Sequence, residues 1–219
     1  MKRTIITLAL FLLAPWPAFA ADADAARKTL TALLPGDVEM ALALTGAPEH
    51  LRGAATVYVF GAKGFTKARE GSNGFTCLLN RDAFFYGSDV FKPTCWDREG
   101  LTSYVPVMLR VGEMLAAGNT AEEIRADIQS GFRAARFHRP NRTGIAYMLA
   151  GDLTLDPRTG ATIRQNFPGH YMIYAPGVTS ADLGYARDAA KTDPSLPFIF
   201  DGGAGGGDLG YLITVPHSH

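Results

Sequence analysis

The segment TVYVFGAKGFTKAREGSNGFTCLL, residues 56–79, decides the fold class. It contains three runs rich in β-branched and aromatic residues, 56–60, 65–70 and 75–79, which two glycine-containing turns separate. This composition is typical of β-strands. Asn73-Gly74 lies between the second and third runs, and Asn-Gly in that position is a strong hairpin signal. The segment therefore predicts three consecutive antiparallel strands.

Helical spacing follows after Cys95. Residues 106–117 place apolar side chains on one face, which predicts a helix. Thr120 and Glu123 have the spacing of a capping box, so a second helix is expected to begin at Thr120. Two earlier helices are expected at residues 22–34 and 38–44, and further strands at 144–149, 171–174, 197–200 and 211–215. This order predicts an α+β fold of one domain, with an antiparallel sheet and a helical pair packed beside it.

Residues 1–20 have the layout of a secretory signal peptide. Lys2 and Arg3 precede an apolar run at 5–14, and Ala18-Phe19-Ala20 matches an A-x-A cleavage site. A buried N-terminal helix is the alternative, whereas a membrane span needs about 20 apolar residues. We therefore expect export to the periplasm or beyond, with no stable membrane span after cleavage. The remaining chain divides into a helical segment, 21–52, and the α+β domain, 53–219.

The composition excludes several classes of protein. Of the 219 residues 47% are hydrophobic and 19% are charged, and the formal net charge is +0, which argues against a disordered chain. Cleavage after Ala20 removes Lys2 and Arg3 from 21 basic residues and leaves all 21 acidic ones, so the net charge becomes −2. A balanced charge offers no general attraction to nucleic acid.

The chain contains two cysteines, Cys77 and Cys95, 18 positions apart. In an oxidising compartment these predict a disulfide, and closing a loop of that size contributes about 3 kcal/mol to stability. The alternatives are two buried free thiols or one reactive thiol.

Four stretches of the chain resemble blocks found in an uncharacterised family of exported bacterial proteins. The main block is EGSNGFTCLL at 70–79, and the other three are 54–59, 144–149 and 168–176. The resemblance implies export and a shared fold, and it carries no known activity.

The candidate catalytic residues are His170 with Glu70 or Cys77. A histidine beside a carboxylate can act as a general base, and a histidine beside a thiol can activate a nucleophile. His170 and Glu70 are each expected at a strand end, where they would meet at one sheet edge. The alternatives are a structural cysteine and a histidine whose hydrogen bonds the protein satisfies.

A second candidate site is formed by Arg136, Arg139 and Arg142. Arginines at three-residue spacing bind phosphate or acidic groups through paired hydrogen bonds. The alternative is a helix with acidic residues at its start, Glu122, Glu123 and Asp127, and basic residues at its end, which complements the helix dipole.

No cofactor and no metal are expected. Residues 205–210 match G-x-G-x-x-G by letter, but a strand is predicted after them, whereas a dinucleotide site needs a helix there. The one H-x-H pattern is at 217–219, the end of the sequence.

Two functional hypotheses follow. The first is an exported, soluble, non-catalytic module that binds a small molecule or an envelope component, because no catalytic signature converges and aromatic residues are frequent in the predicted strands. These aromatic residues are Phe84, Phe85, Tyr86, Tyr171 and Tyr174. The alternative is a small periplasmic hydrolase that uses His170 with Glu70 or Cys77.

Overall fold

The structure is a computed structural model that describes residues 17–185, 188–193, 195–201 and 205–216. The predicted signal peptide therefore lies mostly outside the described residues. No helix in the described part of the chain is both long enough and apolar enough to cross a membrane.

The described helices precede, interrupt and follow the strands. The α-helices are α1 (Pro17–Leu30), α2 (Gly36–Leu44), α3 (Glu49–Arg52), α4 (Arg98–Ala116), α5 (Ala121–Arg133) and α6 (Ala189–Thr192). Three 3-10 helices are η1 (Asp82–Tyr86), η2 (Ser180–Leu183) and η3 (Gly206–Leu209).

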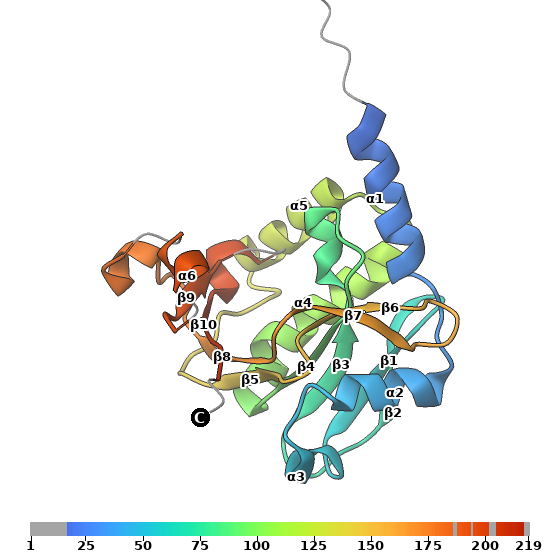
Figure 1. Cartoon of the computed structure of the whole chain (residues 1–219), viewed down its shortest axis with the longest axis horizontal. Helices are drawn as coiled ribbons and strands as arrows, with labels where there is room; N and C mark the ends of the chain where they lie inside the picture. The colour runs from blue at the N-terminus through green and yellow to red at the C-terminus, as the bar shows by residue number, and fades with distance from the viewer. Residues whose placement is uncertain (1–16, 186–187, 194, 202–204, 217–219) are drawn as a thin grey trace, which may run out of the picture.

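The described strands form one large sheet and one small sheet (Figure 1). The strands are β1 (Thr56–Gly61), β2 (Gly64–Arg69), β3 (Thr76–Asn80), β4 (Lys92–Trp96), β5 (Ile145–Met148), β6 (Asp152–Leu155), β7 (Thr162–Phe167), β8 (His170–Tyr174), β9 (Phe198–Phe200) and β10 (Tyr211–Thr214). The large sheet has the order β2-β1-β3-β4-β5-β8-β10-β9, and β6 pairs with β7. All the described pairs are antiparallel except β1 with β3. The predicted α+β class is confirmed.

The predicted three-stranded antiparallel meander is wrong in one pairing. β3 lies beside β1 and runs parallel to it, while β2 is at the sheet edge. The connection after β2 crosses the start of β1, where the amides of Ser72 and Asn73 both donate to the Ala54 carbonyl. A Cβ at Gly71 would lie 2.2 Å from the Thr56 nitrogen, so only glycine fits this crossing. Asn73-Gly74 thus belongs to a crossing connection and not to a hairpin.

Helices cover both faces of the large sheet. The Ala43 carbonyl of α2 lies 3.6 Å from Cys95 Sγ, so Cys95 faces α2. Its neighbour Trp96 packs against Gly100 of α4, and successive residues of a strand point to opposite faces. Helix α2 therefore covers one face of the sheet, and α4 covers the other with α5 packed beside it. This arrangement confirms the predicted helical pair and explains why β3 is buried along its whole length.

Two helix starts test the sequence patterns directly. Helix α5 begins where the capping box predicts: Thr120 Oγ1 accepts from the Glu123 amide, and Glu123 accepts from the Thr120 amide. Helix α4 begins two turns before the predicted start at Pro106, because Asp97 caps it by accepting from the Gly100 amide at 3.0 Å. Pro106 lies inside the helix.

The N-terminal helices share the core of the sheet. Leu30, Leu34, Ala43 and Ala47 are buried in the same cluster as the side chains of β3 and β4. The helical segment 21–52 is therefore packed onto the α+β unit, and the helix predicted at 22–34 ends at Leu30.

Candidate functional site

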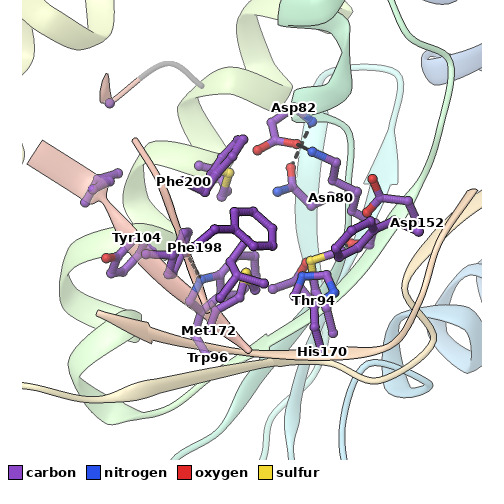
Figure 2. A pocket seen from close by; sticks show the side chains of 18 residues that line it. Asn80, Asp82, Thr94, Trp96, Tyr104, Asp152, His170, Met172, Phe198 and Phe200 are labelled. Atoms are coloured by element: carbon purple, nitrogen blue, oxygen red, sulfur yellow. Dashed lines mark hydrogen bonds and ion pairs between the residues drawn. The ribbon is translucent and has the colours of Figure 1, made fainter. Parts of the chain in front are cut away.

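A cavity of about 240 Å³ lies on the face of the sheet that α4 covers. Its floor comes from alternate residues of β4, β5, β8 and β10, and Tyr104 and Met108 of α4 form one wall. Phe198 and Phe200 of β9 continue this sheet face beside β10, and Leu209 of η3 also lines the cavity. Segments separated by more than 100 residues in the sequence therefore meet around one space (Figure 2).

One end of the cavity is apolar and aromatic. It is lined by Trp96, Tyr104, Met172, Phe198, Phe200 and Tyr211. The polar atoms of this end are already bonded within the protein: Trp96 Nε1 donates to the Tyr211 hydroxyl at 2.8 Å, and the Tyr104 hydroxyl donates to the Gly210 carbonyl at 3.0 Å. This end therefore presents rings and methyl groups to the cavity.

The other end is polar and charged. Asn80, Asp82 and Asp152 lie together there, away from Tyr104 and Phe198, as Figure 2 shows. Lys92 Nζ lies 3.0 Å from Asp82 Oδ1, and both side chains are largely buried. The Asn80 side chain accepts from the Asp82 amide, which holds the start of η1 in place.

The protonation of the charged end depends on burial and on the mutual interaction of Lys92, Asp82 and Asp152. Burial opposes the charge of Lys92, but the carboxylates of Asp82 and Asp152 outweigh it and raise the Lys92 pKa above its usual value. Burial raises the pKa of Asp152, Lys92 opposes that rise, and Asp82 adds to it. Lys92 therefore remains an ammonium, and the two carboxylates compete for it.

His170 also lines the cavity, at the end of β8. It is 3% exposed, and its Nδ1 lies 2.9 Å from the Pro168 carbonyl. Because a carbonyl only accepts, Nδ1 carries the proton and Nε2 is the acceptor of the neutral ring. Burial lowers the pKa of His170, the Pro168 carbonyl opposes this effect, and Lys92 adds to it. The histidine is therefore a neutral side chain at neutral pH.

His170→Gln is expected to reduce the loss of stability on acidification. The unfolded chain takes up a proton at its histidines near pH ~6.5, while burial keeps the folded His170 neutral to lower pH. The unfolded state thus binds more protons as the pH falls below ~6.5, so the stability associated with neutral His170 is complete above that pH and is lost below it. Urea unfolding at a series of pH values measures this slope. His50→Gln, at an exposed position, is the matched control, and an unchanged slope in His170→Gln would contradict the assignment.

The structure does not bring Glu70 to His170, and the predicted pair is wrong. Glu70 follows β2 at one edge of the sheet, and β8 is five strands away, about 24 Å at normal strand spacing. Glu70 is exposed, and its Oε2 lies 2.6 Å from Lys67 Nζ, which lowers the pKa of Glu70. Four strands lie between β2 and β8 in the sheet, and the order of strands in a sheet cannot be read from their order in the sequence.

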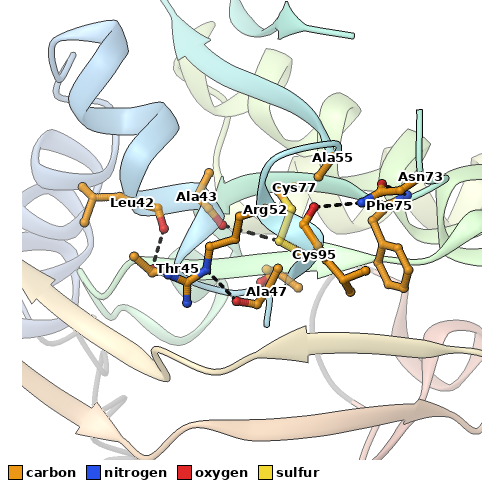
Figure 3. The surroundings of a disulfide bond; sticks show 12 residues. Leu42, Ala43, Thr45, Ala47, Arg52, Ala55, Asn73, Phe75, Cys77 and Cys95 are labelled. Carbon is orange, nitrogen blue, oxygen red and sulfur yellow. Dashed lines mark hydrogen bonds between the residues drawn. A yellow bond between two sulfur atoms is a disulfide. The ribbon is translucent and has the colours of Figure 1, made fainter. Parts of the chain in front are cut away.

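Cys77 is not a nucleophile in this structure, because it forms the predicted disulfide with Cys95 (Figure 3). The two residues lie directly opposite each other in the antiparallel pair β3–β4, with Cα atoms 4.0 Å apart. Both side chains are fully buried beneath α2. The disulfide is confirmed, and the hydrolase that relied on the Cys77 thiol loses its nucleophile.

Arg136, Arg139 and Arg142 do not converge on one site. Each pairs with its own carboxylate: Arg136 with Asp127 at 2.8 Å, Arg142 with Glu99 at 3.2 Å, and Arg139 with Asp208. Helix α5 ends at Arg133, so the helix-dipole interpretation also fails for these three residues. They lie in the connection between α5 and β5 and attach it to α4, α5 and η3.

The aromatic residues proposed as a ligand wall do not line the cavity. Phe84, Phe85 and Tyr86 belong to η1, and the wall comes instead from Phe167, Phe198 and Phe200 with Trp96 and two tyrosines. The sequence analysis also missed Asp82, Lys92 and Asp152. One signal could have revealed Lys92. In a strand, Lys92 shares a face with Thr94 and Trp96, so the sequence places a lysine on a face that is otherwise buried.

Among the described residues, no group of three or more His, Cys, Asp or Glu side chains is arranged to hold a metal ion. The H-x-H pattern at 217–219 lies outside them. Residues 206–209 form η3, and strand β10 follows, as predicted for the glycine-rich stretch.

Fold and site together define an α+β protein with an amphipathic cavity on the face of the sheet that α4 covers. Comparison with protein-family models, with curated proteins and with solved structures gives no match to this chain. The resemblance to exported bacterial proteins thus stays a prediction, and the cavity itself carries the functional conclusion.

Proposed function

We propose that the protein is an exported, non-catalytic module that binds a small amphipathic molecule in the cavity. The observation that carries the proposal is the separation of an apolar aromatic end from a charged end within one space of about 240 Å³. Binding sites for small molecules are mostly apolar and contain a few convergent polar groups that orient the ligand.

The volume limits the size of the ligand. A cavity of about 150 Å³ accommodates benzene, so 240 Å³ suits one aromatic ring with a short substituent, or a short alkyl chain with a polar group. Rings and methionines at one end favour the apolar part, and the charged end favours a polar head.

The chemistry around the cavity supports binding rather than catalysis. His170 donates to a backbone carbonyl and forms no ion pair with a carboxylate among the described residues. Both cysteines are joined in the disulfide. A nucleophile activated by an oriented base, which a hydrolase of this type needs, is thus not assembled from the predicted residues.

Two features support export. The N-terminal pattern is that of a secretory signal, and disulfides persist mainly in oxidising compartments. A small molecule is favoured over an envelope protein, because the conspicuous apolar surface lines a cavity of small volume. The exposed large apolar residues, Leu33, Tyr86, Leu101 and Ile163, belong to four different parts of the described chain.

Filling the cavity is expected to abolish binding. Calorimetric titration of the purified protein with toluene, benzylamine and benzoate identifies which probes bind. Met172→Trp adds bulk to the cavity floor and is expected to weaken the best probe by at least about ten-fold, since it occupies the space that the ligand needs.

Ile163→Trp, on an exposed position of β7 outside the cavity, is the matched control and is expected to bind normally. Ile213→Phe, on the neighbouring strand β10, adds less bulk and replaces Met172→Trp if that variant does not fold. Failure of all three probes to bind, or equal binding by the filled variants, would overturn the proposal.

A further inference from the structure

The charged end of the cavity contains more acidic than basic groups. Asp82 and Asp152 face a single ammonium, that of Lys92, and His170 beside them is neutral. Among the carboxylates of the described residues, Lys92 lies within ion-pair distance of Asp82 alone. With both carboxylates ionised, this end has a net charge of −1 and lacks one cation.

The two carboxylates also have few hydrogen-bond donors within the protein. Asp82 is 9% exposed, and its Oδ1 accepts no hydrogen bond among the described residues, although Lys92 Nζ is 3.0 Å away. Lys92 therefore meets this carboxylate as an ion pair. The Asp152 side chain has no hydrogen bond and no ion pair closer than 4 Å within the same residues. A carboxylate without a donor in a largely apolar site is costly, so Asp152 in particular favours a ligand that brings one.

We propose that the cavity selects a small primary amine that has an aromatic ring or a short alkyl chain. The ammonium would lie between Asp152 and Asp82, and the apolar part would pack against Phe198, Phe200 and Trp96. This inference rests on the proposed function, because it assumes that the cavity binds a small molecule.

Other heads fit this end less well. A carboxylate would meet two carboxylates and one lysine that is already paired, and its desolvation would not be offset. A hydroxyl donates one hydrogen bond, whereas an ammonium donates three and adds the missing charge. Phe200 has its ring centroid 5.7 Å from Lys92 Nζ, so an aromatic face that stabilises cations already borders this end.

The test compares three probes of similar shape and different charge: benzylamine, toluene and benzoate. Titration of the wild-type protein is expected to show benzylamine binding about 10- to 100-fold more tightly than toluene, the factor that a hydrogen-bonded charge contributes. Benzoate is expected to bind most weakly. This comparison needs no variant.

Asp152→Asn keeps the shape of the side chain and removes its charge. It is expected to remove most of the preference for benzylamine and to leave toluene binding unchanged. Asp156→Asn is the matched control: it removes a carboxylate just beyond β6 that bonds the Arg158 amide and does not line the cavity. The Asp156→Asn variant is expected to prefer benzylamine over toluene as strongly as the wild-type protein does. Circular dichroism checks that both variants fold.

The outcomes separate the two proposals. Absence of binding by all three probes contradicts the proposed function itself. Binding of toluene as tight as benzylamine, tighter binding of benzoate, or an unchanged preference in Asp152→Asn leaves a binding cavity but overturns its selectivity for amines.

Discussion

Arg81→Met is expected to lower the free energy of unfolding by about 3–5 kcal/mol, because it leaves the Glu39 carboxylate buried without its cation. Both side chains are fully buried and bonded by two contacts, Nη1–Oε1 at 2.9 Å and Nη2–Oε2 at 2.8 Å. Arg81 also donates to the carbonyls of Leu30 and Leu79, at 2.6 and 2.7 Å. One guanidinium therefore joins α1, α2 and the end of β3.

The surroundings of this pair enlarge the expected effect. Glu39 Oε1 accepts from the Phe60 amide of β1 at 2.7 Å, and the Arg81 guanidinium lies 4.2 Å from the centre of the Phe60 ring. Loss of either partner thus leaves a charge and several polar groups without partners, in a space that water does not reach.

Urea unfolding of three variants tests this prediction. Glu39→Leu and Arg81→Met are each expected to be strongly destabilised, and the double variant less so than the sum of the two, because no unpaired charge remains. Lys28→Met breaks an exposed ion pair with Asp24 and is expected to cause no measurable change. Loss of less than about 1 kcal/mol in both single variants would contradict the role assigned to the pair.

Removal of the Cys77–Cys95 disulfide has the second-largest expected effect. The double variant Cys77→Ala/Cys95→Ala is expected to lose about 3 kcal/mol of stability, the value for a closed loop of this size. The bond joins the neighbouring interior strands β3 and β4 under α2, where both cysteines are fully buried. The loss arises mainly in the unfolded chain, which regains conformational freedom.

Protein recovered from the periplasm of an expression host is expected to contain no free thiol, with or without denaturant. After reduction in denaturant two thiols are expected. The double alanine variant and the reduced wild-type protein should unfold at the same urea concentration, because both lack the same constraint. Free thiols in the native protein, or an unchanged unfolding midpoint in the variant, would contradict the prediction.

Much of the local structure is readable from the sequence. The runs at 56–60, 65–70 and 75–79 become β1, β2 and β3, and Thr120 with Glu123 starts α5. These signals depend on residues within a few positions of one another. β4, β6 and β7 are not predicted. β4 begins with a lysine and a proline, and among the described strands β6 pairs only with β7, which is exposed along nearly its whole length and shows no alternation of buried and exposed residues.

The candidate site is less readable. His170 lines the cavity, but its predicted partners Glu70 and Cys77 lie across the sheet and in the disulfide. Asp82, Lys92 and Asp152 come from η1, β4 and β6, and no short motif contains two of them. Their meeting depends on which strands become neighbours.

The sequence by itself determined the α+β class and the start of α5 and predicted the disulfide, because strand composition, a capping box and a single pair of cysteines are signals that can be read without the fold. Only the tertiary structure decided that β3 lies parallel to β1, that Arg81 is buried against Glu39, and that a charged end and an aromatic end share one cavity. These features depend on contacts between distant segments, and such contacts are selected by the packing of the whole chain and not by any residue's near neighbours.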